Sequence, residues 1–177
     1  LHEIEAMFCR VRTRHWGPRT LDLDLILYGE FTSVIPQLVV PHPAMWYRRF
    51  VLEPAIDVAA DMVHPTLNES VAGLHNRLMY RPLQLEICSS ESAQGNQFLD
   101  EIMNRLRETG RDETAWYPAD PASMIAAGSF ARIILRQGAM LRTSQVLNRK
   151  NRVIEVSGDT AGEVLLQIEH LRIAMTG

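Results

Sequence analysis

The chain has 177 residues, 46% hydrophobic and 22% charged, with a formal net charge of −3. This is a globular composition for one domain or two small ones, and the slightly acidic balance excludes a general nucleic-acid binder, which needs a broad basic surface. No apolar run approaches the roughly 18 residues of a membrane span and no signal-peptide pattern is present, so we expect a cytoplasmic protein without a membrane partner.

The first predicted element is an amphipathic helix at the start of the chain, where Leu1, Ile4, Phe8 and Val11 recur at helical spacing. Because the pattern begins at once, with no N-cap residue before it, we expect the sequence to be a fragment of a longer protein. The two cysteines of the chain have neither disulfide-framework nor zinc-site spacing.

Residues 10–28 are the most informative stretch of the chain. Four arginines, a tryptophan and the turn Gly17-Pro18 precede a segment in which leucine occupies every second position from Leu21 to Leu27. This period of two predicts a β-strand over residues 21–28, with Asp22 and Asp24 together on its other face.

Two aspartates at positions i and i+2 of a strand point the same way, about 6.5 Å apart. Carboxylates so placed can converge on hard cations such as Mg²⁺, and guanidinium groups nearby match phosphate oxygens. The residues therefore indicate a two-metal phosphoryl-transfer site. A plainer alternative stays open, a solvent-facing strand edge whose aspartates pair with nearby arginines.

The next predicted elements are a strand over residues 38–40, an extended His42 between two prolines, and a helix that begins at Glu53-Pro54. That helix should turn Ile56, Ala59 and Ala60 inward. A further helix should bury an apolar stripe, which consists of Leu67, Val71, Leu74 and Leu78.

From Pro82 onward, strand and helix patterns alternate. We predict a strand over residues 83–87, a helix with Phe98, Ile102 and Leu106 inward, a helix from Asp120-Pro121 to about Gly138, a strand over 153–156 and a helix capped by Thr160 and Glu163. Alternating strands and helices predict a small α/β domain with a parallel sheet at 82–177, separated by few contacts from residues 1–81. Its Ser/Gly-containing loop at residues 89–96 lacks the spacing and lysine of a phosphate-binding loop.

Two sequence blocks resemble a known enzyme family. The run His15-Trp16-Gly17-Pro18-Arg19-Thr20-Leu21-Asp22-Leu23-Asp24, followed by Val40-Pro41-His42-Pro43 with Arg48 and Phe50 downstream, resembles 6-hydroxymethyl-7,8-dihydropterin pyrophosphokinase of the folate pathway. Two blocks in order at compatible spacing are far more specific than one short motif. The resemblance covers about residues 1–81 and implies an α+β fold, the C-terminal half of a ferredoxin-like domain.

The resemblance also implies roles for nine residues. Arg10 and Arg19 would be catalytic, and Asp22 and Asp24 would hold two Mg²⁺ ions. Arg12, His42 and Arg48 would contact ATP. Trp16 and Phe50 would bind the pterin. For three of these residues a structural role stays open: Trp16 as a packing anchor, Phe50 as a core residue and His42 as an ordinary solvated histidine.

The implied activity is Mg²⁺-dependent transfer of diphosphate from ATP to the dihydropterin. Because half of the family domain lies outside this sequence, we expect the chain alone to be inactive and prone to self-association through its uncovered N-terminal sheet. Two alternatives remain: a non-catalytic nucleotide-binding or interaction module derived from the enzyme, and an unrelated carboxylate-metal hydrolase. The block with Trp16 and His42 disfavours the hydrolase.

Overall fold

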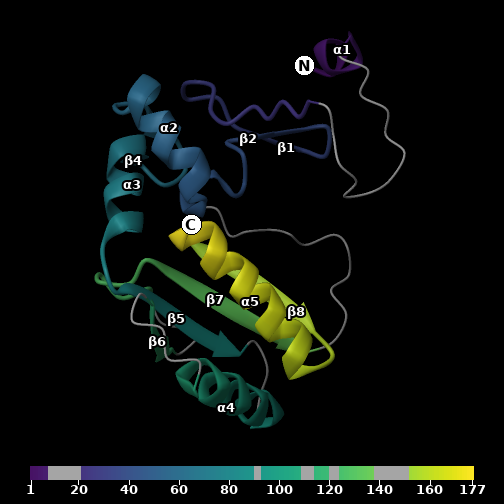
Figure 1. Cartoon of the computed structure of the whole chain (residues 1–177), viewed down its shortest axis with the longest axis vertical. Helices are drawn as coiled ribbons and strands as arrows, with labels where there is room; N and C mark the ends of the chain where they lie inside the picture. The colour runs from purple at the N-terminus through teal and green to yellow at the C-terminus, as the bar shows by residue number, and fades with distance from the viewer. Residues whose placement is uncertain (8–20, 90–92, 109–113, 120–123, 138–151) are drawn as a thin grey trace.

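The computed structural model describes residues 1–7, 21–89, 93–108, 114–119, 124–137 and 152–177. It combines helices and sheets in two groups that follow one another along the chain. In Figure 1 the elements up to α3 occupy the upper part of the molecule, and the larger sheet with its two helices occupies the lower part.

The first group consists of short elements. A helix, α1 (His2–Met7), precedes an antiparallel hairpin of β1 (Ser33–Ile35) and β2 (Leu38–Val40). A 3₁₀ turn, η1 (Met45–Tyr47), leads directly into helix α2 (Arg49–Ala59). A short antiparallel hairpin follows, in which β3 (Val63–His64) and β4 (Glu69–Ser70) have two residues each. Helix α3 (Val71–Met79) begins directly after β4.

Helix α3 follows the predicted apolar stripe. Its N-cap is Ser70, whose hydroxyl accepts the N–H of Gly73 at 3.0 Å, which satisfies one of the free donors of the first turn. Val71, Leu74 and Leu78 are buried, so the helix prediction is confirmed for these positions. Leu67 lies in the turn before β4 and is partly buried against the core.

The second group is a parallel α/β arrangement, as predicted. Strands β5 (Leu83–Ser89), β6 (Thr114–Pro118), β7 (Ala131–Gln137) and β8 (Val153–Gly158) form one sheet in the order β6-β5-β7-β8 with parallel pairing throughout. Helices α4 (Ala93–Glu108) and α5 (Ala161–Thr176) share one hydrophobic core with alternate strand residues. Thr160 caps α5 by accepting the N–H of Glu163 at 3.3 Å, as its capping-box pattern predicts.

The predicted strand at residues 21–28 is not formed. Within the part of the chain that the structure describes, this segment has no ladder partner. Its Ile26 carbonyl accepts the N–H of His42 at 2.8 Å, and its Tyr28 carbonyl accepts the N–H of Phe31 at 3.0 Å in a turn. A strand requires a neighbour that accepts and donates along its length. The alternation nevertheless survives, since Leu21 and Leu23 are half-buried while Asp22 and Asp24 are exposed.

Two helix predictions are also wrong. The interval from Asp120 to Gly138, read as a helix, contains strand β7, whose Ile133 and Leu135 are fully buried between two neighbouring strands. A short apolar run fits a central strand as well as a buried helix, and tertiary packing decided it. Helix α2 begins at Arg49 rather than at Pro54, because the carbonyl of Arg48 already accepts the N–H groups of Val51 and Leu52.

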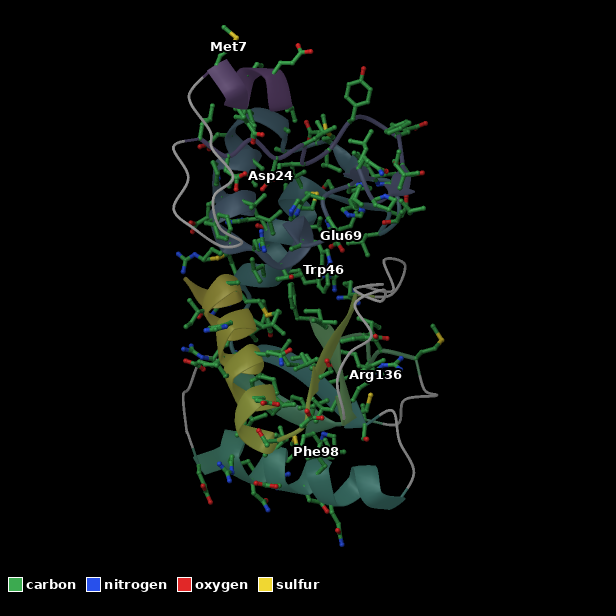
Figure 2. All side chains as sticks on the ribbon, turned by 90° about the vertical axis from the view of Figure 1, so that its right-hand side faces the viewer. Met7, Asp24, Trp46, Glu69, Phe98 and Arg136 are labelled. Carbon is green, nitrogen blue, oxygen red and sulfur yellow. The ribbon has the colours of Figure 1, made fainter. Side chains whose placement is uncertain are left out.

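Contacts across residue 81 are more numerous than expected. The rings of Trp46 and Phe130 lie 5.6 Å apart, and Arg49 Nη1 donates to the carbonyl of Thr176 at 2.5 Å. Figure 2 places Trp46 where the two groups of elements meet. The buried core is continuous across this junction. The expectation of few contacts is therefore wrong, and the division into domains at residue 81 stays a prediction.

Among the described residues, no helix is both long enough and apolar enough to cross a bilayer.

Candidate functional site

The structure describes five of the nine residues assigned to the site. Asp22, Asp24, His42, Arg48 and Phe50 are described, whereas Arg10, Arg12, Trp16 and Arg19 lie outside the described residues. The geometry that follows therefore concerns the aspartate segment and the block around His42.

The two aspartates lie on a segment whose backbone is hydrogen-bonded to helix α1. Both carboxylates are exposed, and the backbone N–H of Leu23 between them donates to Glu5 Oε1 at 3.0 Å. Glu5 comes from α1 and is only 3% exposed. A buried carboxylate that accepts a backbone N–H from a segment far along the chain fixes that segment in place. The sequence interpretation missed Glu5, whose only signal was a charged residue close to the apolar stripe of its helix.

His42 connects the aspartate segment to the rest of the site. Its backbone N–H donates to the carbonyl of Ile26, and its ring Nδ1 accepts the backbone N–H of Ala44 at 3.2 Å. Burial lowers the pKa of His42, the positive charge of Arg48 lowers it further, and the negative charge of Asp24 opposes both. The imidazole is therefore neutral near pH 7. With Nδ1 accepting, its proton is on Nε2, which is left as a donor.

Arg48 occupies the junction between η1 and α2 and is half-buried. Its positive charge acts on the neighbouring Tyr47: burial raises the pKa of the Tyr47 hydroxyl, and the influence of Arg48 opposes that shift. The Cζ atom of Arg48 also lies 5.6 Å from the centre of the Phe50 ring, within reach of a cation–π contact. Two aromatic neighbours, Tyr47 and Phe50, thus lie beside one cation, and the sequence interpretation missed Tyr47.

Phe50 is not a core residue. Its side chain is 64% exposed in the first turn of α2, so the core alternative for this residue is wrong. An exposed aromatic ring beside an arginine is available for stacking on a flat ligand.

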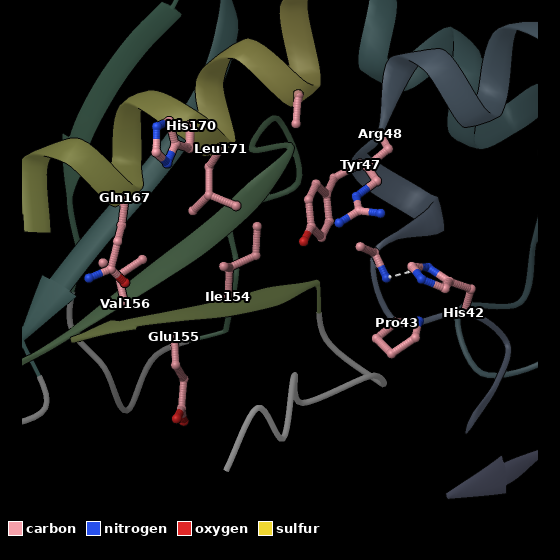
Figure 3. A pocket seen from close by; sticks show the side chains of 12 residues that line it. His42, Pro43, Tyr47, Arg48, Ile154, Glu155, Val156, Gln167, His170 and Leu171 are labelled. Atoms are coloured by element: carbon pink, nitrogen blue, oxygen red, sulfur yellow. Dashed lines mark hydrogen bonds between the residues drawn. The ribbon is translucent and has the colours of Figure 1, made fainter. Parts of the chain in front are cut away.

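A cavity of about 520 Å³ opens beside this block. Figure 3 shows His42, Tyr47 and Arg48 along one side, and Ile154, Gln167 and Leu171 from β8 and α5 along the other. Its volume lies in the range of small-molecule pockets. No sequence pattern pointed to the second side, because its residues follow the first by more than a hundred positions.

The donor set suits an anionic ligand together with a hard cation. Neutral His42 and cationic Arg48 line the cavity and carry N–H donors, and phosphate oxygens are good partners for such groups. No cluster of three or more metal-binding side chains occurs among the described residues. Two exposed carboxylates nevertheless fit Mg²⁺, which binds through one or two carboxylates and keeps its other positions for water and phosphate.

Comparison with known proteins agrees with this chemistry. Residues 1–60 match the family model described as 7,8-dihydro-6-hydroxymethylpterin-pyrophosphokinase. A protein of Synechocystis sp. named 2-amino-4-hydroxy-6-hydroxymethyldihydropteridine pyrophosphokinase is 48% identical over 71 residues, which are 40% of this chain and 36% of that protein. A protein of the same name from Pseudomonas aeruginosa is 51% identical over 65 residues, 37% of this chain and 40% of the relative.

A third relative matches over a longer stretch. The bifunctional protein FolKE of Lactococcus lactis subsp. cremoris is 29% identical over 114 residues, which are 63% of this chain and 32% of that protein. The chain therefore spans between about a third and two fifths of the length of these curated relatives. The family resemblance is confirmed for the N-terminal part of the chain, where residues 1–60 match the family model.

Proposed function

We propose that the protein catalyses the Mg²⁺-dependent transfer of diphosphate from ATP to 6-hydroxymethyl-7,8-dihydropterin in folate biosynthesis. The observation that carries the proposal is the juxtaposition of Asp24, His42 and Arg48. The charges of Asp24 and Arg48 both act on His42, and the last two residues line a cavity of about 520 Å³. All three lie within the stretch that matches the family.

In the proposed reaction, the hydroxyl oxygen of the pterin attacks the β-phosphorus of ATP. The new O–P bond forms as the bond between the β-phosphorus and the α,β-bridging oxygen breaks, the diphosphate passes to the pterin, and AMP leaves with that oxygen. The hydroxyl proton is released to solvent or to a basic oxygen. Because positioning and charge stabilisation supply most of the catalysis of such transfers, the residues need to hold phosphates rather than form covalent bonds.

The roles follow the chemistry of the side chains. Asp22 and Asp24 would hold two Mg²⁺ ions, which when bound neutralise charge on the phosphate oxygens. Arg48 would bind a phosphate through its oriented guanidinium, and His42 would donate from Nε2. Arg10, Arg12 and Arg19 would stabilise the charge that develops on the transferred group. Phe50 and Trp16 would stack on the pterin ring.

We further propose that residues 1–81 are part of a ferredoxin-like pyrophosphokinase domain and that 82–177 form a small α/β domain beside it, in a cytoplasmic protein. The exposed apolar side chains of the N-terminal part support association with a further segment or a second copy. They include Ile4, Met7, Val34 and Ile35, which are 45%, 80%, 75% and 54% exposed. Burying such side chains stabilises by about 2 kcal/mol each.

The test is an AMP-release assay with ATP, Mg²⁺ and the dihydropterin. It is run on the 177-residue chain and on a version extended at its N-terminus by the preceding family segment. We expect AMP release that requires the pterin and Mg²⁺ from the extended version and little from the 177-residue chain. If both proteins bind ATP but release no AMP, the proposal fails and a non-catalytic nucleotide-binding module takes its place.

A further inference from the structure

A second cavity, of about 460 Å³, lies where β4 and α3 meet the start of β5. Glu69 and Arg77 line it from the first group of elements, and Gln84, Gly128 and Phe130 line it from the second. Figure 2 places Glu69 close to the level at which the two groups meet. The second cavity shares no lining residue with the cavity described above, and all its residues lie beyond the stretch that matches the family. The proposed function therefore gives it no role.

Arg77 is held in this cavity with part of its guanidinium unused. Its Nε donates to Glu69 Oε1 and Oε2 at 3.2 and 3.3 Å, and its Nη2 donates to Oε1 at 3.0 Å. Among the described residues, Nη1 has no hydrogen-bond acceptor. The two side chains are 36% and 23% exposed. The ion pair thus orients the guanidinium and leaves two N–H donors for a ligand.

A second arginine is fixed close by. Arg152, which precedes β8, donates through Nη1 to the carbonyls of Ser129 and Phe130 at 3.1 and 2.9 Å. It is half-buried. These bonds hold the cation against the segment that carries Phe130, one of the residues lining the cavity.

The charges around the second cavity leave an excess of positive charge. Burial lowers the pKa of Arg152, the charge of Arg77 lowers it further, and the charges of Glu69 and Glu86 oppose both. Glu86 is already paired with Arg132. Two guanidinium groups therefore share the Glu69 carboxylate, which leaves one positive charge in excess among these described groups. This balance favours a ligand with a single negative charge.

The remaining walls combine amide groups with apolar surface. Gln84 and Asn76 contribute carboxamides, and the Gln84 carboxamide has no hydrogen-bond partner among the described residues. Leu83 and Phe130 are 1% and 3% exposed, and the Tyr80 ring is 67% exposed. An apolar cavity with a few converging polar groups is typical of a small-molecule site.

We propose that the second cavity binds a small organic carboxylate. The planar carboxylate group pairs with Nη1 of Arg77, since guanidinium and carboxylate geometries match. The apolar body of the ligand packs against Phe130 and Tyr80, and Gln84 hydrogen-bonds to it. A phosphate is disfavoured because its charge of about −1.5 to −2 near neutral pH would exceed the local excess beside Glu69.

Calorimetric titration of the N-terminally extended version tests the ligand class. The test ligands are benzoate, its neutral isostere benzamide, and inorganic phosphate. We expect saturable binding of benzoate, with benzamide and phosphate weaker by about tenfold or more. Benzamide or phosphate binding as tightly as benzoate would overturn the inference, as would the absence of benzoate binding up to about 10 mM.

Variants then test the location. Arg77→Gln should weaken benzoate binding by about tenfold or more. The matched control is Arg105→Gln, which removes the same charge from an ion pair with Glu101 on α4, away from the second cavity. Thermal unfolding checks that both variants are folded. Unchanged benzoate affinity in Arg77→Gln would overturn the inference.

A steric variant decides the matter if Arg77→Gln does not fold. A Cβ atom at Gly128 would lie 3.0 Å from Gln84 Oε1, so Gly128→Leu should occupy part of the second cavity and weaken benzoate binding by about tenfold or more. Ala127→Leu is the control, at the adjacent exposed position that does not line the cavity. Equal benzoate affinity in these two variants would overturn the inference.

The outcomes separate this inference from the proposed function. If benzoate binds with the expected dependence on Arg77 but no AMP is released with the dihydropterin, the inference stands and the proposed pyrophosphokinase activity fails. If AMP is released but benzoate does not bind, the proposed function stands and the inference fails.

Discussion

Charged groups are placed in opposite ways in the two regions of this molecule. Asp22 and Asp24 are exposed on a segment without ladder partners among the described residues. Glu86 and Arg132, by contrast, are paired in the middle of the parallel sheet, with side chains 6% and 4% exposed. The first pair is exposed to solvent, whereas the second is buried within the fold.

The Glu86–Arg132 pair meets the conditions that a buried ion pair requires. Arg132 donates to Glu86 Oε2 through Nε at 2.8 Å and Nη2 at 2.6 Å, and Nη2 also reaches the carbonyl of Met124 at 3.1 Å. Ala126 donates its N–H to Glu86 Oε1 at 2.6 Å. Partners that satisfy both ions offset the cost of removing them from water. The comparison teaches that loss of an exposed carboxylate should affect activity, and loss of a buried partner should affect stability.

The largest effect should follow from removing one exposed aspartate. We expect Asp24→Ala to lower AMP release by about a thousandfold or more, because one carboxylate cannot place two ions, with an unfolding temperature close to that of the parent. The assay uses the N-terminally extended version. Asp57→Ala is the control, since Asp57 is exposed on α2 away from the cavity. Turnover near the parent rate would contradict the metal assignment.

The reverse pattern is expected in the sheet. Arg132→Met should reduce the free energy of unfolding by about 3–5 kcal/mol, because it leaves the Glu86 carboxylate buried without its cation. Chemical denaturation measures this change. Arg136→Met is the control and should cost under about 1 kcal/mol, since Arg136 is 51% exposed in its pair with Glu155. Equal losses in the two variants would show that burial does not distinguish these pairs.

Acid should reveal the same buried pair. Burial alone would raise the pKa of Glu86, but hydrogen bonds from Ala126, Arg132 and Ser129 and the charge of Arg132 hold it below its ordinary value of 4.5. Between these two pKa values the unfolded state binds more protons than the folded state, so stability is complete above pH 4.5 and falls as pH decreases through the folded pKa.

The measurement is the free energy of unfolding between pH 7 and pH 3 in the parent and in Glu86→Gln. We expect a shallower decline below pH 4.5 in the variant, because the glutamine side chain does not titrate. Parallel curves would mean that Glu86 contributes nothing to the acid sensitivity.

The smallest effect should arise at Tyr47, which lies between the two regions. Tyr47→Phe removes the hydroxyl whose pKa is influenced by the neighbouring Arg48, so the guanidinium loses a polar neighbour at the cavity. We expect binding of a non-hydrolysable ATP analogue to weaken by about three- to tenfold, equivalent to roughly 1 kcal/mol. Tyr28→Phe, at a ring that is 68% exposed and outside the cavity, is the control. An unchanged dissociation constant for Tyr47→Phe would assign Tyr47 to packing alone.

Local sequence patterns were sufficient to predict a helix or strand where the residues that its periodicity places on one face are also the residues that pack against the core. The apolar stripe of α3, the alternation in β5 and the capping box of α5 each contain their own signal within a few residues, and each prediction is confirmed. The pattern failed at β7, where a short apolar run fits both a strand and a helix. It also failed at residues 21–28, since alternation alone does not supply a hydrogen-bonding partner.

The sequence by itself determined the family resemblance of the N-terminal part, because two motif blocks at compatible spacing are specific without any knowledge of contacts, and residues 1–60 match that family's model. It also determined the parallel α/β character of the C-terminal part. Only the tertiary structure decided which distant residues meet: Glu86 with Arg132, Glu5 with the backbone of Leu23, and β8 and α5 with the block around His42. These contacts join positions from 18 to more than a hundred residues apart. Local periodicity carries no information about such pairs, because they are selected by the packing of whole elements against a shared core.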